Sequence, residues 1–154
     1  MKKNDIKNTL KEIKPTPYLE TRLEAKVKAL GITNVEFLKA VPQDVLNACY
    51  ASAHAFLCLS EHEGFCAPLV EAMLHQIPIF ALSAAAVPET LDGAGVLFDQ
   101  PPNYPVIAES IAEVLHNQSL RDAVIARQDM RVQAIRNRDL SAELRSLFSP
   151  LIGA

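Results

Sequence analysis

Hydrophobic side chains recur along this chain with two spacings that alternate from segment to segment. Runs of consecutive apolar residues are typical of strands buried on both faces, whereas apolar residues three or four positions apart are typical of helices. The runs predict strands over residues 35–38, 55–59, 79–82 and 95–98. The helical spacing predicts helices over residues 18–30, 42–53, 68–75, 88–91, 106–116 and 120–136, and a final helix and tail over 138–154.

The alternation of strands with helices predicts the fold class. A helix between two strands carries the chain back along the sheet, so consecutive strands pair in parallel through right-handed crossovers. We therefore expect an α/β fold: a Rossmann-like parallel sheet of about four strands, flanked by helices, with the runs 55–59 and 79–82 buried on both faces. The chain has 154 residues, of which 49% are hydrophobic, and this is enough for one core.

The first residues differ in composition from the rest. Residues 1–17 are polar and rich in lysine, and they end on Pro15-Thr16-Pro17, so we expect a polar leader there. Residues 18–154 are expected to form one partial Rossmann-like domain. No apolar run is long enough for a signal peptide or a transmembrane segment, which predicts a cytoplasmic chain.

Charge and cysteine content narrow the candidate ligands. The net charge is -3 and the Lys and Arg residues are scattered, which argues against nucleic acid as a partner. Cys49, Cys58 and Cys66 are odd in number and match no C-x-x-C or Cys/His ligand spacing, which argues against a disulfide framework and against a zinc site. We therefore expect reduced thiols, no metal and no cofactor.

Two loops lie where open parallel sheets bind their ligands. Such ligands bind beyond the carboxyl ends of the strands, where loops lead into helix N-termini. The loops are residues 60–67 and 83–86. The helix after each loop begins with unpaired backbone N–H groups and the positive end of the helix dipole, and both favour a bound phosphate.

Two carboxylates flank the first loop. Glu63 lies within it, and Glu71 lies about one turn into the following helix. A carboxylate at Glu71 can accept two hydrogen bonds from a ribose diol, and Glu63 can contact sugar hydroxyls or stabilise positive charge at an anomeric carbon. Structural alternatives stay open: Ser60 and Glu63 fit the S-x-x-E of a helix capping box, and the helix dipole favours Glu71 whatever its function.

The segment around these carboxylates resembles a known signature. Residues 60–73, Ser-Glu-His-Glu-Gly-Phe-Cys-Ala-Pro-Leu-Val-Glu-Ala-Met, look like the E-x7-E motif of family 4 retaining glycosyltransferases, which have the GT-B fold of two Rossmann-like domains facing a cleft. Further matching segments stand in the family's order: Ala29-Leu30-Gly31, Cys49-Tyr50-Ala51-Ser52-Ala53, Pro78-Ile79-Phe80-Ala81, Val87-Pro88-Glu89-Thr90 and residues 93–98. The resemblance extends from residue 18 to about residue 131.

The resemblance implies an activity, a donor and a set of site residues. Such enzymes, typical of polysaccharide biosynthesis, transfer a hexose from a UDP-, GDP- or ADP-linked donor with retention, usually without an essential metal. By this resemblance Glu63 is the catalytic carboxylate near the donor sugar, and Glu71 binds the nucleotide ribose. The other donor-binding positions are Gly64, Phe65, Cys66 and Ala67 of the loop, and Ala40 and Val41, which form the turn where the family packs its nucleobase.

Two positions depart from the family's pattern. Many members have glycine where this chain has Cys66, and the usual glycine before the next strand is replaced within Gln76-Ile77-Pro78. A cysteine narrows the space beside the sugar but leaves the backbone amide in place, so neither departure breaks the pattern.

Other parts of the family's site have no counterpart here. The Arg and Lys that hold the donor pyrophosphate, and the acceptor domain, lie upstream of the matched region, and nothing before Tyr18 supplies them. We therefore expect residues 18–154 to form an incomplete nucleotide-sugar-binding domain that binds its donor weakly and transfers no sugar alone. We also expect this domain to join a separate N-terminal acceptor domain or to self-associate. The alternatives are a non-catalytic nucleotide-sugar-binding or assembly module, and a plain α/β interaction domain.

Overall fold

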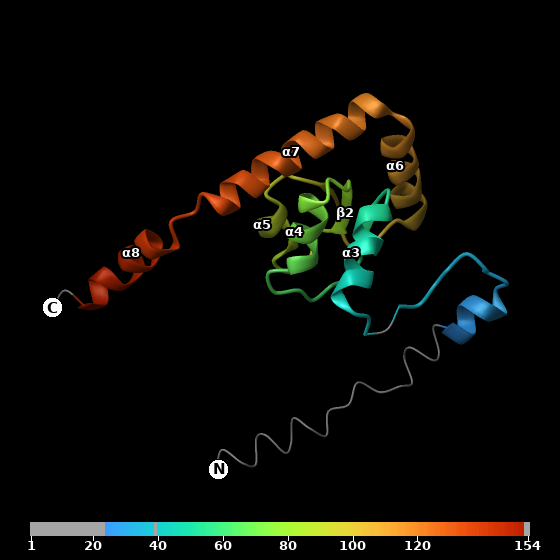
Figure 1. Ribbon diagram of the computed structural model, residues 1–154, viewed down its shortest axis with the longest axis horizontal. Helices are drawn as coiled ribbons and strands as arrows, with labels where there is room; N and C mark the ends of the chain where they lie inside the picture. The colour runs from blue at the N-terminus through green and yellow to red at the C-terminus, as the bar shows by residue number, and fades with distance from the viewer. Residues whose placement is uncertain (1–23, 39, 153–154) are drawn as a thin grey trace, which may run out of the picture. The chain divides into compact units, whose positions relative to one another are not determined.

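The computed structural model describes residues 24–38 and 40–152, which fall into two compact units (Figure 1). The first unit ends at Pro42 and the second begins at Gln43. The predicted leader over residues 1–17 lies outside the described residues, as does the beginning of the helix predicted from residue 18.

A short helix and an irregular segment make up the described part of the first unit. Residues 24–29 are helical, and the chain leaves the helix through Gly31, whose φ of 67° is left-handed. The Ile32 amide donates to the Val27 carbonyl at 3.2 Å, which closes the last turn. The predicted helix end at Gly31 is therefore confirmed.

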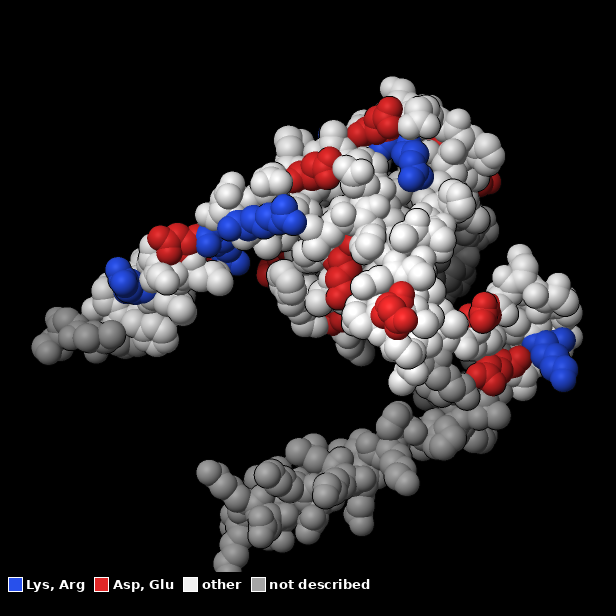
Figure 2. Space-filling model, in the orientation of Figure 1, with Lys and Arg blue, Asp and Glu red and all other residues white. Residues whose placement is uncertain are grey.

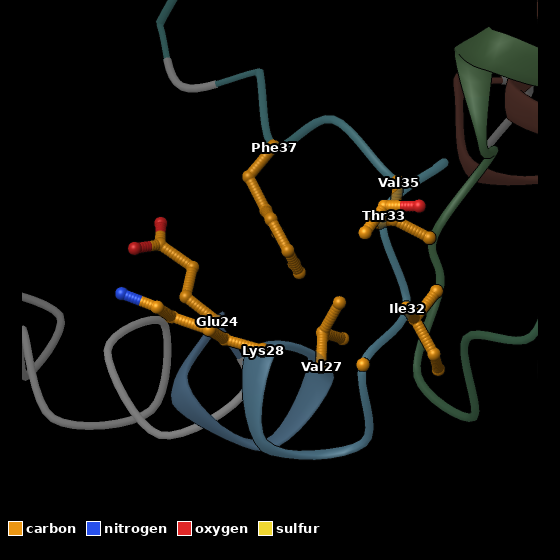
Figure 3. Close-up of a pocket in the computed structure, with 8 residues that line it drawn as sticks. Glu24, Val27, Lys28, Ile32, Thr33, Val35 and Phe37 are labelled. Carbon is orange, nitrogen blue, oxygen red and sulfur yellow. The ribbon is translucent and has the colours of Figure 1, made fainter.

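The strand predicted over residues 35–38 is wrong, because this segment has no strand conformation in the structure. A strand needs a neighbouring strand for its backbone hydrogen bonds, and the described residues of this unit contain none. Val35 and Phe37 of this segment instead line a hollow of about 500 Å³ beside the helix, where Phe37 points toward Val27 (Figure 3).

The second unit alternates helices and strands as predicted. Its elements are α3 (Gln43–Ser52), β1 (Phe56–Cys58), α4 (Ala67–Leu74), β2 (Ile79–Leu82), α5 (Val87–Leu91), β3 (Val96–Phe98), α6 (Tyr104–His116), α7 (Gln118–Arg136) and α8 (Leu140–Ile152). None of the described helices is long and apolar enough to cross a membrane. Acidic and basic side chains are interspersed over α7 and α8 (Figure 2).

The three strands form a parallel sheet in the order β1-β2-β3. The central strand β2 is buried along its whole length, as predicted. The edge strand β1 is not buried on both faces, because Leu57 is 45% exposed, so that part of the prediction is wrong. Phe56 and Cys58 pack against the main core, whereas Leu57 points to the opposite face of the sheet, which is not fully covered at β1.

Helices cover the sheet unequally. Ile79 and Ala81 of β2 belong to the main core together with buried residues of α4, α5 and α7. Phe80 of β2 faces the opposite side, in register with Val96 of β3, which lies beside α6. The sheet is therefore flanked by helices, as the sequence predicts for a Rossmann-like layer.

A buried glutamine connects α7 to the amino end of β2. Gln128 is 0% exposed; its Nε2 donates to the Ile77 carbonyl at 2.8 Å, and its Oε1 accepts from the Ile79 amide at 3.2 Å. Both backbone groups lie in the core, where water cannot replace these bonds. The side chain thus fixes the position of β2, and with it the loops at the sheet's carboxyl edge.

Candidate functional site

The loop that follows β1 leads into the N-terminus of α4. This helix begins at Ala67, with Pro68 in its first turn and Cys66 as the residue before it. The Ser60 hydroxyl donates to the His62 carbonyl at 3.4 Å, and no side chain caps α4. Because the helix begins four residues after Glu63, the capping-box interpretation of Ser60 and Glu63 is wrong.

Backbone amides at the start of α4 are available to a ligand. In the part of the chain that the structure describes, no hydrogen bond has the N–H of Phe65, Cys66 or Ala67 as its donor. Gly64 has open space around it, since a methyl group added to its Cα would meet no heavy atom within 4 Å. The positive end of the α4 dipole lies at the same place, and together these features favour an anion.

Thr90 of α5 orients one of these amides. Its hydroxyl donates to the Phe65 carbonyl at 2.7 Å, and Thr90 itself is only 3% exposed. The Phe65 carbonyl and the Cys66 N–H belong to one trans peptide and point in opposite directions. The bond to Thr90 therefore turns the Cys66 N–H away from α5.

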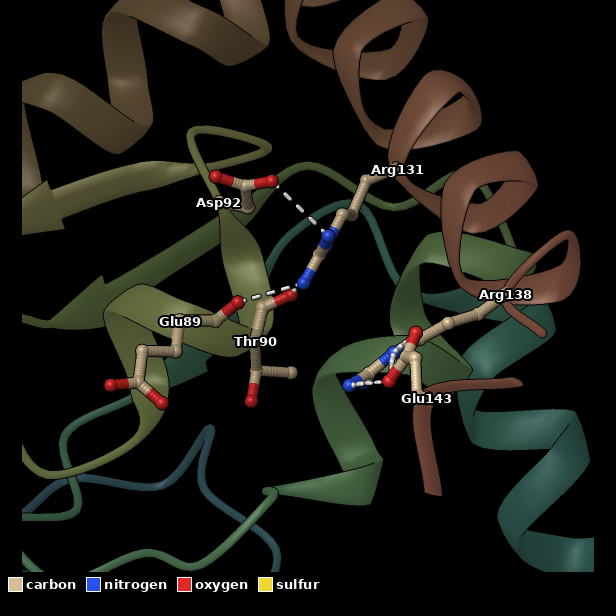
Figure 4. A network of polar contacts seen from close by, with 6 residues as sticks. All are labelled: Glu89, Thr90, Asp92, Arg131, Arg138 and Glu143. Atoms are coloured by element: carbon tan, nitrogen blue, oxygen red, sulfur yellow. Dashed lines mark hydrogen bonds and ion pairs between the residues drawn. The ribbon is translucent and has the colours of Figure 1, made fainter. Parts of the chain in front are cut away.

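Arg131 of α7 in turn holds α5 in place (Figure 4). Its guanidinium donates to the carbonyls of Glu89 and Thr90 at 2.8 and 3.0 Å and to the Asp92 carboxylate at 3.1 Å. These are the carbonyls that a helix leaves unpaired at its C-terminus. A continuous set of bonds thus runs from α7 through α5 to the Phe65 carbonyl.

Two arginines that share a hollow with Phe65 of the loop are already bound to other groups. A hollow of about 410 Å³ beside Phe65 is lined by Arg131, Arg138 and apolar residues of α7 and α8. Arg138 binds Glu143 through paired bonds of 2.7 and 2.6 Å, which raises the pKa of Arg138 and lowers that of Glu143 (Figure 4). These contacts leave the α4 amides as the better anion donors.

Glu63 lies beside two thiols. The Sγ atoms of Cys58 and Cys66 are 4.0 Å apart, and a Glu63 carboxylate oxygen lies within 4.8 Å of both. The pKa of the Cys66 thiol is raised to about 12, mainly by burial and in part by the nearby Cys58 and Glu63. Sequence reasoning missed this group, because the Cys-x7-Cys spacing gives no signal without the turn that brings its ends together.

Glu71 lies beside Tyr50 of α3. Burial is the largest cause that raises the pKa of Tyr50 to about 12, and the adjacent Glu71 carboxylate is the next. The Tyr50 ring stacks on His75, with ring centroids 5.3 Å apart, and on Phe56 at 6.1 Å. Tyr50 therefore packs α3 against α4 beside Glu71. In the sequence, the only signal for this role of Tyr50 is its place in the Tyr-Ala segment that matches the family.

The structure brings several of the predicted site residues together within the second unit. Cys66 lies close enough to Tyr50 to raise the pKa of that tyrosine, and Glu63 lies close enough to Cys66 to raise the pKa of its thiol. Tyr50, beside Glu71, and Cys66, beside Glu63, therefore both lie near the start of α4. Ala40 is exposed and Val41 half-buried, and both belong to the first unit. Their contact with a nucleobase stays a prediction.

Both departures from the glycine pattern keep a glycine-like backbone. Cys66 has a φ of 54° and Gln76 a φ of 55°, in the left-handed region that side chains other than glycine rarely adopt. The turn into α4 and the turn out of it therefore have the conformation that glycine would adopt, with a side chain added.

Comparison with known proteins identifies the family. Residues 17–131 match the family described as Glycosyl transferases group 1. The chain is similar to O-antigen chain mannosyltransferase B of Escherichia coli, at 32% identity over 93 residues that cover 60% of this chain and 24% of the relative. This chain thus spans far less than the relative's length, and no solved structure matches it significantly. The family match covers most of the chain and includes the loop, both carboxylates and all three described strands, and the chain therefore belongs to the glycosyl transferases group 1.

Proposed function

We propose that this chain is the donor-binding part of a retaining hexosyltransferase that acts in polysaccharide biosynthesis. The observation that carries the proposal is the set of unpaired amides at the start of α4, with one carboxylate on each side. A mannosyl donor is the first candidate, because the similar protein from Escherichia coli is named a mannosyltransferase.

The donor diphosphate would bind at the amides of Phe65, Cys66 and Ala67. A helix terminus of this kind contributes about 0.3–1 kcal/mol for an exposed anion, rising to about 2 kcal/mol where the site is partly buried. Arg131 and Arg138 are bound to other groups, so they add little. This supports feeble binding of the donor by the isolated chain.

The two carboxylates would divide the rest of the donor between them. Glu71 is half-buried on α4, and there its carboxylate can accept both hydroxyls of the ribose. Glu63, in the loop that precedes the amides, would face the sugar and stabilise the positive charge that develops at the anomeric carbon. Ala40 and Val41 would contact the nucleobase, as the resemblance implies.

Transfer itself requires more than donor binding. Holding donor and acceptor in reacting geometry can supply about 7–11 kcal/mol of barrier lowering, and this needs both sides of a closed cleft. We therefore propose that the chain alone transfers no sugar and needs an acceptor-binding partner domain.

Two variants test the assignment of the carboxylates. Glu71→Ala should abolish binding of both free nucleotide and nucleotide sugar in an NMR titration, because the ribose contact is common to both. Glu63→Ala should weaken binding of the nucleotide sugar and leave that of the free nucleotide unchanged. Equal effects of the two variants on both ligands would refute the division of roles.

Turnover tests the proposed incompleteness. The purified chain is incubated with a mannose nucleotide and water or an acceptor glycan, and release of free nucleotide is followed. The proposal predicts no release above background. Robust transfer by the chain alone would show that it is a complete small enzyme.

A further inference from the structure

Three side chains with metal-binding atoms meet at the carboxyl end of β1. Cys58 ends β1, Cys66 directly precedes α4, and Glu63 lies in the loop between them. Their two Sγ atoms and a carboxylate oxygen all lie within 4.8 Å of one another. Within residues 24–38 and 40–152, no other group of three His, Cys, Asp or Glu residues comes this close.

The distance between the two sulfur atoms suits a tetrahedral ion, and the Glu63 oxygen, within 4.8 Å of both, would have to move closer to complete the set. Zinc binds thiolate sulfur at about 2.3 Å and carboxylate oxygen at about 2.0–2.2 Å, so two sulfurs on one tetrahedral zinc lie about 3.8 Å apart. The Sγ atoms of Cys58 and Cys66 are 4.0 Å apart, which needs an adjustment of only a few tenths of an ångström. A disulfide, with sulfurs about 2.05 Å apart, would need a movement of about 2 Å.

A cation at this point would have to displace the thiol protons. Without an ion, two thiolates and a carboxylate would place three negative charges together where Cys66 is only 7% exposed. Such like charges suppress one another's ionisation, and a bound divalent ion reverses this by stabilising the deprotonated ligands. Thiolate ligands select zinc over the harder magnesium and calcium ions.

We propose that Cys58, Cys66 and Glu63 form a binding site for a zinc-class divalent cation, with a fourth coordination position open to water or a ligand. The ion would tie the end of β1 to the start of α4 and so fix the loop between them.

This site does not rest on the proposed glycosyl transfer. Glu63 is also the residue that we propose for the donor sugar, so the ion and the sugar would compete for one carboxylate. Because metal binding is measured without any nucleotide sugar, either proposal can fail while the other stands.

Cobalt(II) is the probe, because thiolate ligands give it charge-transfer absorption in the near ultraviolet and tetrahedral geometry gives strong bands in the visible. One equivalent of Co²⁺ added to the reduced, metal-free full chain should produce both absorptions. Zn²⁺ added afterwards should remove them by displacement.

Variants locate the ligands. Cys58→Ser should lower the Co²⁺ affinity roughly 100-fold or more, and Glu63→Gln roughly tenfold, because each removes or weakens one ligand. Cys49→Ser is the matched control, since Cys49 is a half-buried cysteine on α3 outside the group, and should bind Co²⁺ like the original chain. Far-UV circular dichroism of each variant shows that it is folded, and Glu63→Gln, outside every helix and strand, leaves the core untouched.

Two results would overturn the proposal. One is a Co²⁺ spectrum without thiolate charge transfer, or with equal affinity in the original chain and in Cys58→Ser. The other is a reduced chain that binds no Co²⁺ while mild air oxidation consumes both thiols, which would make the pair a disulfide-forming pair.

Discussion

Two residues, Cys66 and Gln76, stand where the family usually has glycine, and their backbone conformations explain why the turns around α4 are kept. Cys66 and Gln76 adopt left-handed backbone conformations, which cost a residue with a Cβ about 1–2 kcal/mol relative to glycine. Sequence alone shows that a glycine is replaced, but it does not show whether the backbone keeps the left-handed conformation that glycine favours. The structure shows that it does, so the amide of Cys66 stays at the start of α4.

Cys66 should make the protein less stable at alkaline pH. In the metal-free chain its pKa is raised from 9.0 to about 12, mainly by burial, so between these values the unfolded chain loses a proton that the native chain keeps. The stability is fully present below about pH 9 and is lost as the pH rises through this window, by at most about 1.4 kcal/mol per pH unit for one proton.

Cys66→Ala should therefore flatten the fall in the free energy of unfolding above about pH 9, measured by urea unfolding at several pH values. Cys49→Ala serves as the control and should keep the slope. A slope unchanged by Cys66→Ala would contradict the assigned burial of this thiol.

At the scale of elements, the helices of the second unit could be predicted, with errors mainly at their N-termini. The apolar spacing predicts starts at residues 106 and 120, whereas α6 and α7 begin at Tyr104 and Gln118. The asparagines before them accept hydrogen bonds from the Val106 and Leu120 amides, and these caps extend each helix by two residues. The spacing of apolar residues indicates only the buried part of a helix, so a polar first turn is not predicted from it.

Gln128 should contribute strongly to stability, although the spacing of apolar residues along α7 gives no sign that this polar residue is buried. Gln128→Leu would leave the Ile77 carbonyl and the Ile79 amide buried without partners, which should cost about 2–4 kcal/mol. Chemical unfolding of Gln128→Leu and of Gln133→Leu, an exposed position on the same helix, measures this difference. Equal stability of the two variants would refute the role of Gln128.

Thr90 should act as a positioning residue for donor binding. Thr90→Val keeps the shape but removes the hydroxyl that holds the Phe65 carbonyl, so the Cys66 N–H loses its fixed direction. We expect roughly tenfold weaker nucleotide-sugar binding, about 1.4 kcal/mol, and recovery in Thr90→Ser, which keeps the hydroxyl. Thermal unfolding of Thr90→Val shows whether the protein is merely less stable. Unchanged nucleotide-sugar binding in Thr90→Val would rule out a positioning role for Thr90.

At the scale of the whole molecule, the parallel order of the strands could be predicted, but the extent of the sheet could not. A run of apolar residues shows that a segment suits a sheet, as at residues 35–38, but not whether a partner strand is present. The strands β1, β2 and β3 pair in chain order, as the alternation with helices predicts, and no described strand pairs with the other edge of β1.

The open edge of β1 should drive self-association. Leu57 and Leu59 are exposed there, and unpaired strand edges recruit other chains. Leu57→Lys should lower the mass seen by light scattering at high concentration, whereas Leu74→Lys, at an exposed leucine on α4, should not. A clean monomer of the unmodified chain would count against this expectation.

Saturation-transfer NMR with UDP-, GDP- and ADP-linked sugars tests the central claim, donor binding at the start of α4, most directly. It detects weak binding without turnover, and the transfer to each proton shows which part of the ligand lies against the protein. We predict transfer to at least one of the three ligands, strongest at its ribose protons, and its loss in Glu71→Gln. No transfer to any nucleotide sugar, or transfer undiminished in Glu71→Gln, would contradict the account.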